Sequence, residues 1–280
     1  ATGTPVAEAE VPQGYRDPSP FSFKKGDTVA ILGNGLADRM QHDGWTEALL
    51  QSELKGKEVS FRNMSLSGDR PNQYPRSKGF TPMGQYLQHV KADVVFAMFG
   101  YNESFSGPQA ADSYKKLLID FVAKIRSYKP NGKDFPRIVL FSPIAFEDLK
   151  DRNLPRGKAH NKNLAAFSKA TEEAAREAGV AYVDLFGPTL KLYEQEKEPL
   201  TLNGAHLNEL GNKKVGELIA QALLKKQISA SPTQEKLRQA VLEKNWHWHN
   251  RYRATDGNDV WGGRSGLRFV DDQSNAEVLQ

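Results

Sequence analysis

Short apolar runs alternate along the chain with longer stretches in which apolar residues recur every three or four positions. The short runs are rich in β-branched residues and are six or seven residues long, which is typical of strands buried on both faces. They comprise residues 27–32, 58–63, 93–99, 137–142 and 180–186. The sequence therefore predicts five strands.

The stretches between the runs have the spacing of amphipathic helices. From Tyr114 to Tyr128 the apolar side chains repeat at intervals of three and four, which places them on one helix face. An alanine-rich segment at 160–178 is expected to end at Gly179, a typical stop signal. Further helices are expected near residues 45–50, 215–223 and 233–249. Strands that alternate with helices predict an α/β fold, here a three-layer α/β/α sandwich with a five-stranded parallel, flavodoxin-like sheet.

The chain divides into three segments. Residues 1–25 contain four prolines and show no periodicity, so an extended N-terminal arm is expected. Residues 26–230 carry the alternating pattern of the α/β domain. Residues 231–280 are expected to form a C-terminal helix followed by an irregular wrap.

Composition and charge exclude several classes of protein. The absence of cysteine excludes disulfides, thiol nucleophiles and iron–sulfur clusters. The 38 basic and 34 acidic residues give a net charge of +4 and form no dense basic stripe, so nucleic acid is not an expected partner. No apolar run approaches the roughly 20 residues that cross a bilayer. The chain begins at Ala1, from which we expect a secreted or periplasmic protein with its signal peptide removed, or alternatively a cytoplasmic one.

Polar and titratable residues gather directly after the predicted strands. In an open parallel sheet, ligands bind beyond the carboxyl ends of the strands. The segments at those ends, or just before the last helix of the domain, are 33–38, 65–69, 100–104, 142–143 and 203–208. We therefore expect a site at this edge of the sheet.

Four of these segments resemble the motifs of the SGNH hydrolases, also called the GDSL family of esterases and lipases. Gly33-Asn34-Gly35-Leu36 stands where the family has Gly-Asp-Ser-Leu. Asn203-Gly204-Ala205-His206 resembles the last family motif, Asp-x-x-His, which supplies the catalytic base and its orienting carboxylate. The resemblance implies acyl transfer, in which a hydroxyl attacks an ester carbonyl and an imidazole takes its proton.

The two middle segments resemble the motifs that stabilise the oxyanion. Residues 63–69 are similar to the second family block, and the resemblance implies that the backbone N–H of Gly68 is a donor. Residues 100–103 are similar to the third block, Gly-x-Asn-Asp, and imply a second donor in the side chain of Asn102.

The nucleophile and the triad acid of this family are both replaced. Gly35 has no side chain, Asn203 cannot carry a charge, and the first-block Asp is the amide Asn34. Only His206 remains of the triad. Losing a triad nucleophile costs roughly a millionfold in rate in serine proteases, so the ordinary esterase mechanism is not expected unless another hydroxyl substitutes. The candidates for that hydroxyl are Ser65, Ser67 and Ser104.

A water-based mechanism is the alternative to a substitute hydroxyl. His206 with Asp69, Glu103 or Asp38 would act as general base and acid, as in glycosidic chemistry. If Glu103 and Asp69 have no catalytic role, they are ordinary loop acids that are solvated or paired with basic residues. If His206 has none, it caps the helix that starts near Gly211.

Three further features leave alternatives open. Arg251 would contact an anionic or sugar ligand, or only help to dock the terminal helix. The basic loop 70–80 would roof the pocket or be a solvated loop. His247 and His249 are two residues apart, unlike the i, i+4 pair of a zinc helix, so no metal is expected.

These observations favour a descendant of the SGNH hydrolases that acts on or binds a carbohydrate or small ester. Its site would comprise His206, Asn203, Asn102, Gly68, Asn34 and Gly35, with Asp69, Glu103, Ser104 and Arg251 binding the substrate. The alternative is a catalytically inactive protein that keeps the pocket for ligand binding. No cofactor is expected, and the oligomeric state is left open.

Overall fold

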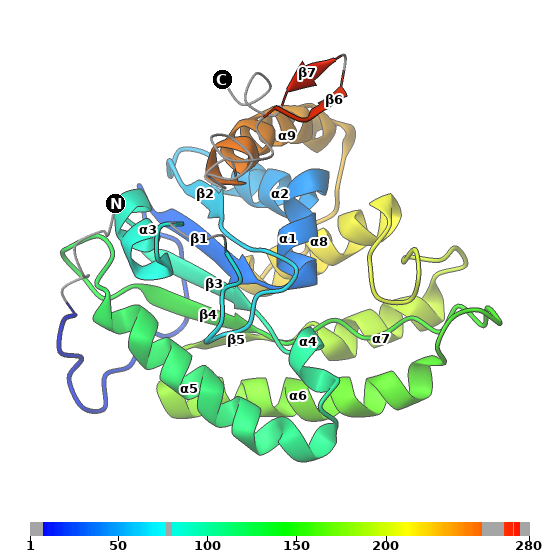
Figure 1. The fold of residues 1–280 in the computed structure, drawn as a ribbon, viewed down its shortest axis with the longest axis horizontal. Coiled ribbons are helices and arrows are strands. Elements are labelled where there is room, and N and C mark those ends of the chain that lie inside the picture. Colours follow the sequence, from blue (N-terminus) through cyan, green and yellow to red (C-terminus); the bar gives the residue numbers. More distant parts are fainter. Residues whose placement is uncertain (1–7, 77–79, 254–265, 271, 275–280) are drawn as a thin grey trace.

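The computed structural model describes residues 8–76, 80–253, 266–270 and 272–274. Its centre is a parallel sheet of five strands in the order β2-β1-β3-β4-β5 (Figure 1). The strands are β1 (Thr28–Gly33), β2 (Ser60–Asn63), β3 (Val94–Met98), β4 (Arg137–Phe141) and β5 (Ala181–Val183). The predicted α/β fold is confirmed, and each strand overlaps the apolar run that predicts it.

Helices cover both faces of the sheet (Figure 1). They are α1 (Gly35–Asp43), α2 (Trp45–Glu53), α3 (Met83–Val90), α4 (Tyr101–Ser104), α5 (Ala111–Ser127), α6 (Gly157–Ala178), α7 (Phe186–Gln195), α8 (Glu209–Leu224) and α9 (Pro232–Arg253). A 3-10 turn, η1, spans Pro108–Ala110, and a short antiparallel pair is formed by β6 (Arg268–Val270) and β7 (Gln273–Ser274).

Alternate residues of each central strand enter different cores, because successive side chains of a strand point to opposite faces. Val29 and Ile31 of β1 pack with α1, α2 and α8. Ala30 and Leu32 pack with α3, α5 and α6. All four side chains are buried, which explains why the run is apolar throughout rather than alternating with polar residues.

The helix ends follow local chemistry. Gly179 ends α6 in the left-handed conformation, at φ 65°, as its position predicts. The fifth strand stops at Val183, before the end of its apolar run, because the carboxylate of Asp184 accepts the N–H of Phe186 at 3.0 Å where α7 begins. The apolar spacing predicts none of helices α1, α3, α4 and α7.

Two segments outside the sandwich are tied to it by buried polar contacts. Residues 8–25 contain no helix or strand, and Asp17 pairs there with Arg126 of α5 at 2.7 Å. Helix α9 packs against α1, α2 and β2 (Figure 1). Most of the wrap predicted for 254–280 lies outside the described residues. Within the described part of the chain, none of the helices combines the length and apolarity that a bilayer crossing requires.

Candidate active site

A cavity of about 180 Å³ lies beyond the carboxyl ends of β1, β3 and β4. Its wall contains residues from all four sequence motifs, and it also includes the segment that follows β4. The lining residues are Asn34, Gly35, Leu36, Ser67, Met98, Phe99, Tyr101, Asn102, Ser142, Pro143, Ile144, Ala205 and His206. The sheet therefore brings together segments that are far apart in the sequence, at the edge where ligands bind in open α/β sheets.

The imidazole of His206 is oriented by Asn203. Nδ1 of the ring lies 3.1 Å from Oδ1 of Asn203, which also accepts the backbone N–H groups of Ala205 and His206 at 3.2 and 3.0 Å. An amide oxygen only accepts hydrogen bonds, so the Nδ1 of His206 must carry the proton in this contact. Nε2 is then left as the basic nitrogen of the ring.

The environment of His206 favours the neutral ring. Burial lowers the pKa of this imidazole, and the nearby positive charge of Arg39 lowers it further. Arg39 lies one helical turn after Gly35 on α1, and both residues line a smaller hollow with His206. An imidazole that is neutral at pH 7 can accept a proton there.

Gly35 leaves the nucleophile position open. It is the first residue of α1 and lines the same cavity as His206. A Cβ added at Gly35 would meet no atom within 4 Å. The cavity therefore has room for a side chain, or for part of a ligand, where the family motif has its serine.

Of the two predicted oxyanion donors, Asn102 lines the cavity and Gly68 does not. Nδ2 of Asn102 donates to the backbone carbonyl of Ser67 at 2.8 Å, and both residues line the cavity. Gly68 follows Ser67 directly but is not among the lining residues. Its φ lies outside the left-handed region, and an added Cβ would make only an ordinary contact with Pro75 at 3.4 Å. Backbone conformation therefore does not require glycine at position 68.

Glu103 is a buried carboxylate beneath the cavity. Its Oε2 accepts the N–H of Gly100 at 2.7 Å and Nδ2 of Asn34 at 3.3 Å. Its Oε1 is buried and has no hydrogen-bond partner among the described residues. Burial raises the pKa of Glu103. The carboxylate thus holds Asn34 and the turn at Gly100 but does not line the cavity.

Asp69 is fully buried and paired. Its two oxygens accept the guanidinium of Arg76 at 2.5 and 2.8 Å, and Oδ2 also accepts the N–H of Leu66 at 3.0 Å. Burial raises the pKa of Asp69, whereas Arg76 acts in the opposite direction. The structure places this carboxylate within the loop that carries Gly68, outside the cavity lining.

Two of the candidate hydroxyls point away from the cavity. Ser104 is buried and donates to the carbonyl of Tyr101 within α4 at 2.7 Å. Ser65 donates to the carbonyl of Ile31 at 3.1 Å. Neither residue lines the cavity, so the structure does not bring these hydroxyls to His206.

The two serines that do line the cavity are engaged with carboxylates. Ser67 donates to Oδ2 of Asp38 at 2.6 Å. Ser142 donates to Asp184 at 3.1 Å and accepts the N–H of Leu185 at 2.7 Å. Sequence reasoning did not select Ser142 as a site residue, although its place directly after the fourth strand is a signal that could have found it.

The remaining substrate-binding candidate, Arg251, lies away from the cavity. It is exposed on α9 and does not line the cavity.

The helix cap proposed for His206 is instead supplied by Asn208, whose Oδ1 accepts the N–H of Gly211 at 2.8 Å. The capping alternative for His206 is therefore wrong.

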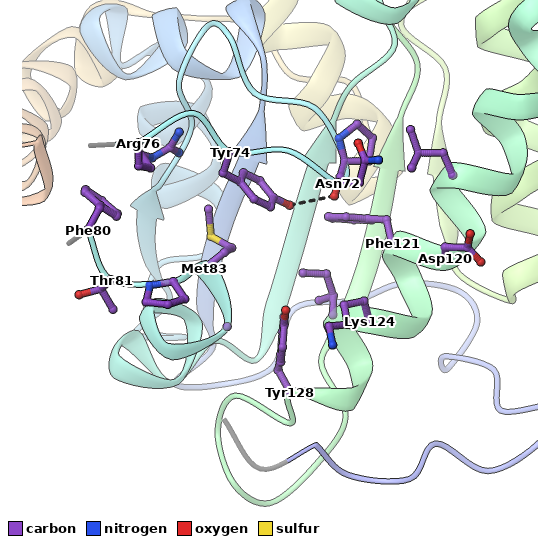
Figure 2. Close-up of a pocket in the computed structure, with 15 residues that line it drawn as sticks. Asn72, Tyr74, Arg76, Phe80, Thr81, Met83, Asp120, Phe121, Lys124 and Tyr128 are labelled. Atoms are coloured by element: carbon purple, nitrogen blue, oxygen red, sulfur yellow. Dashed lines mark hydrogen bonds between the residues drawn. The ribbon is translucent and has the colours of Figure 1, made fainter. Parts of the chain in front are cut away.

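A larger cavity of about 720 Å³ lies between loop 71–76, the start of α3 and α5 (Figure 2). Tyr74, Phe80, Met83, Phe121 and Tyr128 give it a mostly apolar wall. Pro71, Asn72, Tyr74, Arg76 and Phe80 of the basic loop 70–80 line this cavity, whereas no described residue of that loop lines the cavity at the strand ends. Its lining contains no histidine, and none of the four sequence motifs contributes to it.

The chain matches the model of the GDSL-like lipase/acylhydrolase family over residues 26–214, which is more than half of its length. It therefore belongs to this family. No curated protein matches it.

Several solved structures share the fold. A GDSL-like lipase from Parabacteroides merdae is 14% identical, with a TM-score of 0.56 over 73% of this chain and 99% of the other. A catalytic mutant of Axe2, an acetylxylan esterase from Geobacillus stearothermophilus, is 14% identical, with a TM-score of 0.52 over 72% and 96%. A lipase/acylhydrolase from Enterococcus faecalis is 17% identical, with a TM-score of 0.50 over 70% and 94%. At these identities the likeness establishes the fold alone.

Proposed function

We propose that this protein is a GDSL-family hydrolase descendant that binds a small ester or an acylated carbohydrate at the strand-end cavity. It would not form an acyl-enzyme, because position 35 has no hydroxyl. The observation that carries the proposal is the open space at Gly35 in the wall that also contains His206. In this proposal His206 is the retained base and Asn102 the amide donor, and position 35 lacks the hydroxyl that would attack the ester.

The chemical class of the ligand follows from the cavity wall. Leu36, Met98 and Ile144 contribute apolar surface, whereas Asn102 and His206 contribute polar groups. A hollow of about 180 Å³ suits a short acyl group bound through its carbonyl oxygen. The acetylxylan esterase among the structural neighbours supports an acetylated sugar as the first ligand to test.

Restoring the nucleophile tests this proposal directly. Gly35→Ser adds a side chain where nothing lies within 4 Å, so it should fold as the wild type does. We expect no hydrolysis of p-nitrophenyl acetate or acetylated xylo-oligosaccharides by the wild type and measurable hydrolysis by Gly35→Ser. Gly35→Ala and the double variant Gly35→Ser/His206→Ala are the matched controls, and both should be inactive.

The binding part of the proposal is tested without turnover. Titration calorimetry of the wild type with an acetylated xylo-oligosaccharide should show binding that Asn102→Ala weakens, while the deacetylated sugar should bind less tightly. Failure of both the titration and the Gly35→Ser assay, in variants that keep their far-UV spectrum, would contradict the proposed ligand class.

A water-based hydrolysis is the second candidate, and the state of His206 favours it. The neutral ring, with Nδ1 bonded to Asn203, presents a basic nitrogen that can take a proton from water. Slow turnover by the wild type would then be lost in His206→Ala and unchanged in Ser67→Ala. Turnover that persists in His206→Ala would exclude this mechanism.

A further inference from the structure

The last turns of α9 hold the end of strand β2. Nε1 of Trp248 donates to the carbonyl of Asn63 at 2.6 Å, and the hydroxyl of Tyr252 donates to the carbonyl of Met64 at 3.0 Å. Tyr252 is only 2% exposed. These two carbonyls lie where the strand leaves the sheet and the loop 64–69 begins.

A single guanidinium joins the two ends of this loop. Nη2 of Arg76 donates to the carbonyl of Met64 at 3.2 Å and to Oδ2 of Asp69 at 2.8 Å. The same nitrogen lies 3.4 Å from the hydroxyl of Tyr252, which accepts from it. Tyr252 therefore completes a buried network that clamps the first and last residues of the loop. Burial raises the pKa of Tyr252 to about 12, so its hydroxyl keeps its proton at neutral pH.

The clamped loop contributes one polar residue, Ser67, to the wall of the cavity. Ser67 lines the cavity and accepts the side chain of Asn102, and Gly68 follows it. A misplacement of about 1 Å at a reacting centre can cost about 10²-fold in rate, so the position of this loop matters for a ligand in the cavity. Its two ends are held by the network that includes α9.

Helix α9 lies beyond the part of the chain that matches the family model, which ends at residue 214. The contacts from Trp248 and Tyr252 to the loop thus come from a segment outside the matched residues. Aromatic packing fixes this end of the helix, since Tyr252 contacts Phe80 and Tyr86 at ring distances of 5.3 and 4.8 Å and stacks on Trp248 at 5.9 Å.

We propose that Tyr252 is a positioning residue for the cavity, which acts through the carbonyl of Met64 and the Arg76–Asp69 pair to hold the loop that carries Ser67 and Gly68. The proposal rests on the proposed function in one respect only: the loop it positions is taken to contact the ligand. Its structural part can be measured without any ligand.

Hydrogen exchange of residues 64–70, followed by mass spectrometry, tests the structural part. Tyr252→Phe removes the hydroxyl and keeps the aromatic ring. We expect exchange in this segment to become at least about fivefold faster, with little change in the strands, since opening of the loop costs less than global unfolding. Arg76→Lys keeps the positive charge but loses the planar guanidinium that donates to several acceptors at once, so it should have the same effect.

Tyr182→Phe is the matched control. Tyr182 lies on β5, the edge strand farthest from β2, and its hydroxyl lies 3.2 Å from Oγ and 3.4 Å from the carbonyl oxygen of Ser168, so this variant also loses internal hydrogen bonding. It should leave exchange in 64–70 unchanged. Equal acceleration in Tyr182→Phe, or none in Tyr252→Phe and Arg76→Lys, would overturn the positioning role.

Activity of the Gly35→Ser variant separates this inference from the proposed function. Adding Tyr252→Phe to Gly35→Ser should lower kcat about tenfold with a smaller change in KM, and adding Tyr182→Phe should not. If Gly35→Ser is inactive but Tyr252→Phe loosens the loop, the proposed function fails and the positioning of the loop stands. If Gly35→Ser is active and Tyr252→Phe changes neither exchange nor kcat, the positioning role fails alone.

Discussion

The side-chain oxygen of Asn203 lies 3.1 Å from Nδ1 of His206, so an amide orients the imidazole where the family motif has a carboxylate. The contact fixes the tautomer as a carboxylate would, because the oxygen accepts in both cases. It supplies no negative charge, so it does not stabilise a protonated ring. Tautomer and charge stabilisation, which one aspartate combines in a serine triad, are therefore separated in this site.

The first prediction concerns that missing charge. In the Gly35→Ser background, Asn203→Asp should raise kcat for p-nitrophenyl acetate by at least about tenfold, because the carboxylate stabilises the imidazolium that forms when the serine attacks. The new oxygen can still accept the N–H groups of Ala205 and His206. Steady-state kinetics on both variants measure the effect.

The pH profile of the same pair is a second readout. Activity requires the neutral imidazole, whose pKa is lowered by burial and by Arg39, so the Gly35→Ser profile should rise with pH to a midpoint below 6.5. A carboxylate at position 203 favours the charged ring and should move the midpoint upward. A midpoint that stays in place would show that the new carboxylate does not interact with His206.

The second prediction concerns Asn102. Removing one oxyanion donor typically costs about 10²- to 10³-fold in kcat. Asn102→Ala in the Gly35→Ser background should therefore lower kcat about a hundredfold. The melting temperature should hardly change, because the side chain is only partly buried and bonds one carbonyl. Asn72→Ala, an exposed amide at the larger cavity, is the control, and an equal loss in that variant would argue against a donor role.

The third prediction concerns Glu103 and stability. Burial raises the folded-state pKa of this carboxyl above about 4.5. The folded state then binds the proton more tightly than the unfolded state, so this contribution to stability is complete below pH 4.5 and is lost as pH rises through the raised pKa. Glu103→Gln is neutral at every pH. Between pH 4.5 and 8 its free energy of unfolding should therefore rise relative to that of the wild type, by about 1 kcal/mol.

Urea unfolding at several pH values measures this difference. Asp69→Asn should behave in the opposite way, with a loss of about 3–5 kcal/mol at neutral pH, because it leaves the guanidinium of Arg76 buried without its partner. A loss of stability in Glu103→Gln that grows with pH would show that the ionised carboxylate is the favoured form in the fold.

The fourth prediction compares two glycines of the site. Gly100 has φ 108°, and an added Cβ would lie 2.9 Å from the hydroxyl of Tyr114. Gly100→Ala should therefore cost about 2 kcal/mol or more in the free energy of unfolding. Gly35→Ala should stay within about 0.5 kcal/mol of the wild type, because its Cβ meets nothing within 4 Å. Equal losses would mean that position 35 is more crowded than the structure shows.

The strands and most helices could be predicted from the sequence because their signals are local. The apolar run of β1 and the spacing of α5 are each readable within a single window. Helix α1 was missed because it begins at Gly35, in a segment whose glycines and polar residues are typical of a loop. Its first turn is set by the end of β1 and by the cavity rather than by apolar spacing.

The site was only partly predictable for a similar reason. The motifs identify His206 and Asn102. The expectation that ligands bind at the carboxyl ends of parallel strands places both residues at one edge of the sheet, where they line the same cavity. The burial of Ser104 and the pairing of Asp69 with Arg76 depend on packing that the spacing of residues does not encode. The contact between Tyr252 and Met64 joins residues that are 188 positions apart, and no local sequence pattern around either residue predicts it.

That long separation has a consequence for biosynthesis. The contacts of Asn245, Trp248 and Tyr252 reach back 204, 185 and 188 residues. A chain emerging from the ribosome can assemble its sheet before α9 is translated, since domains form progressively during synthesis. The loop beside the cavity acquires its clamp only after residue 252 has left the exit tunnel, so a nascent chain stopped short of that point would carry an unfinished pocket on an otherwise folded sandwich.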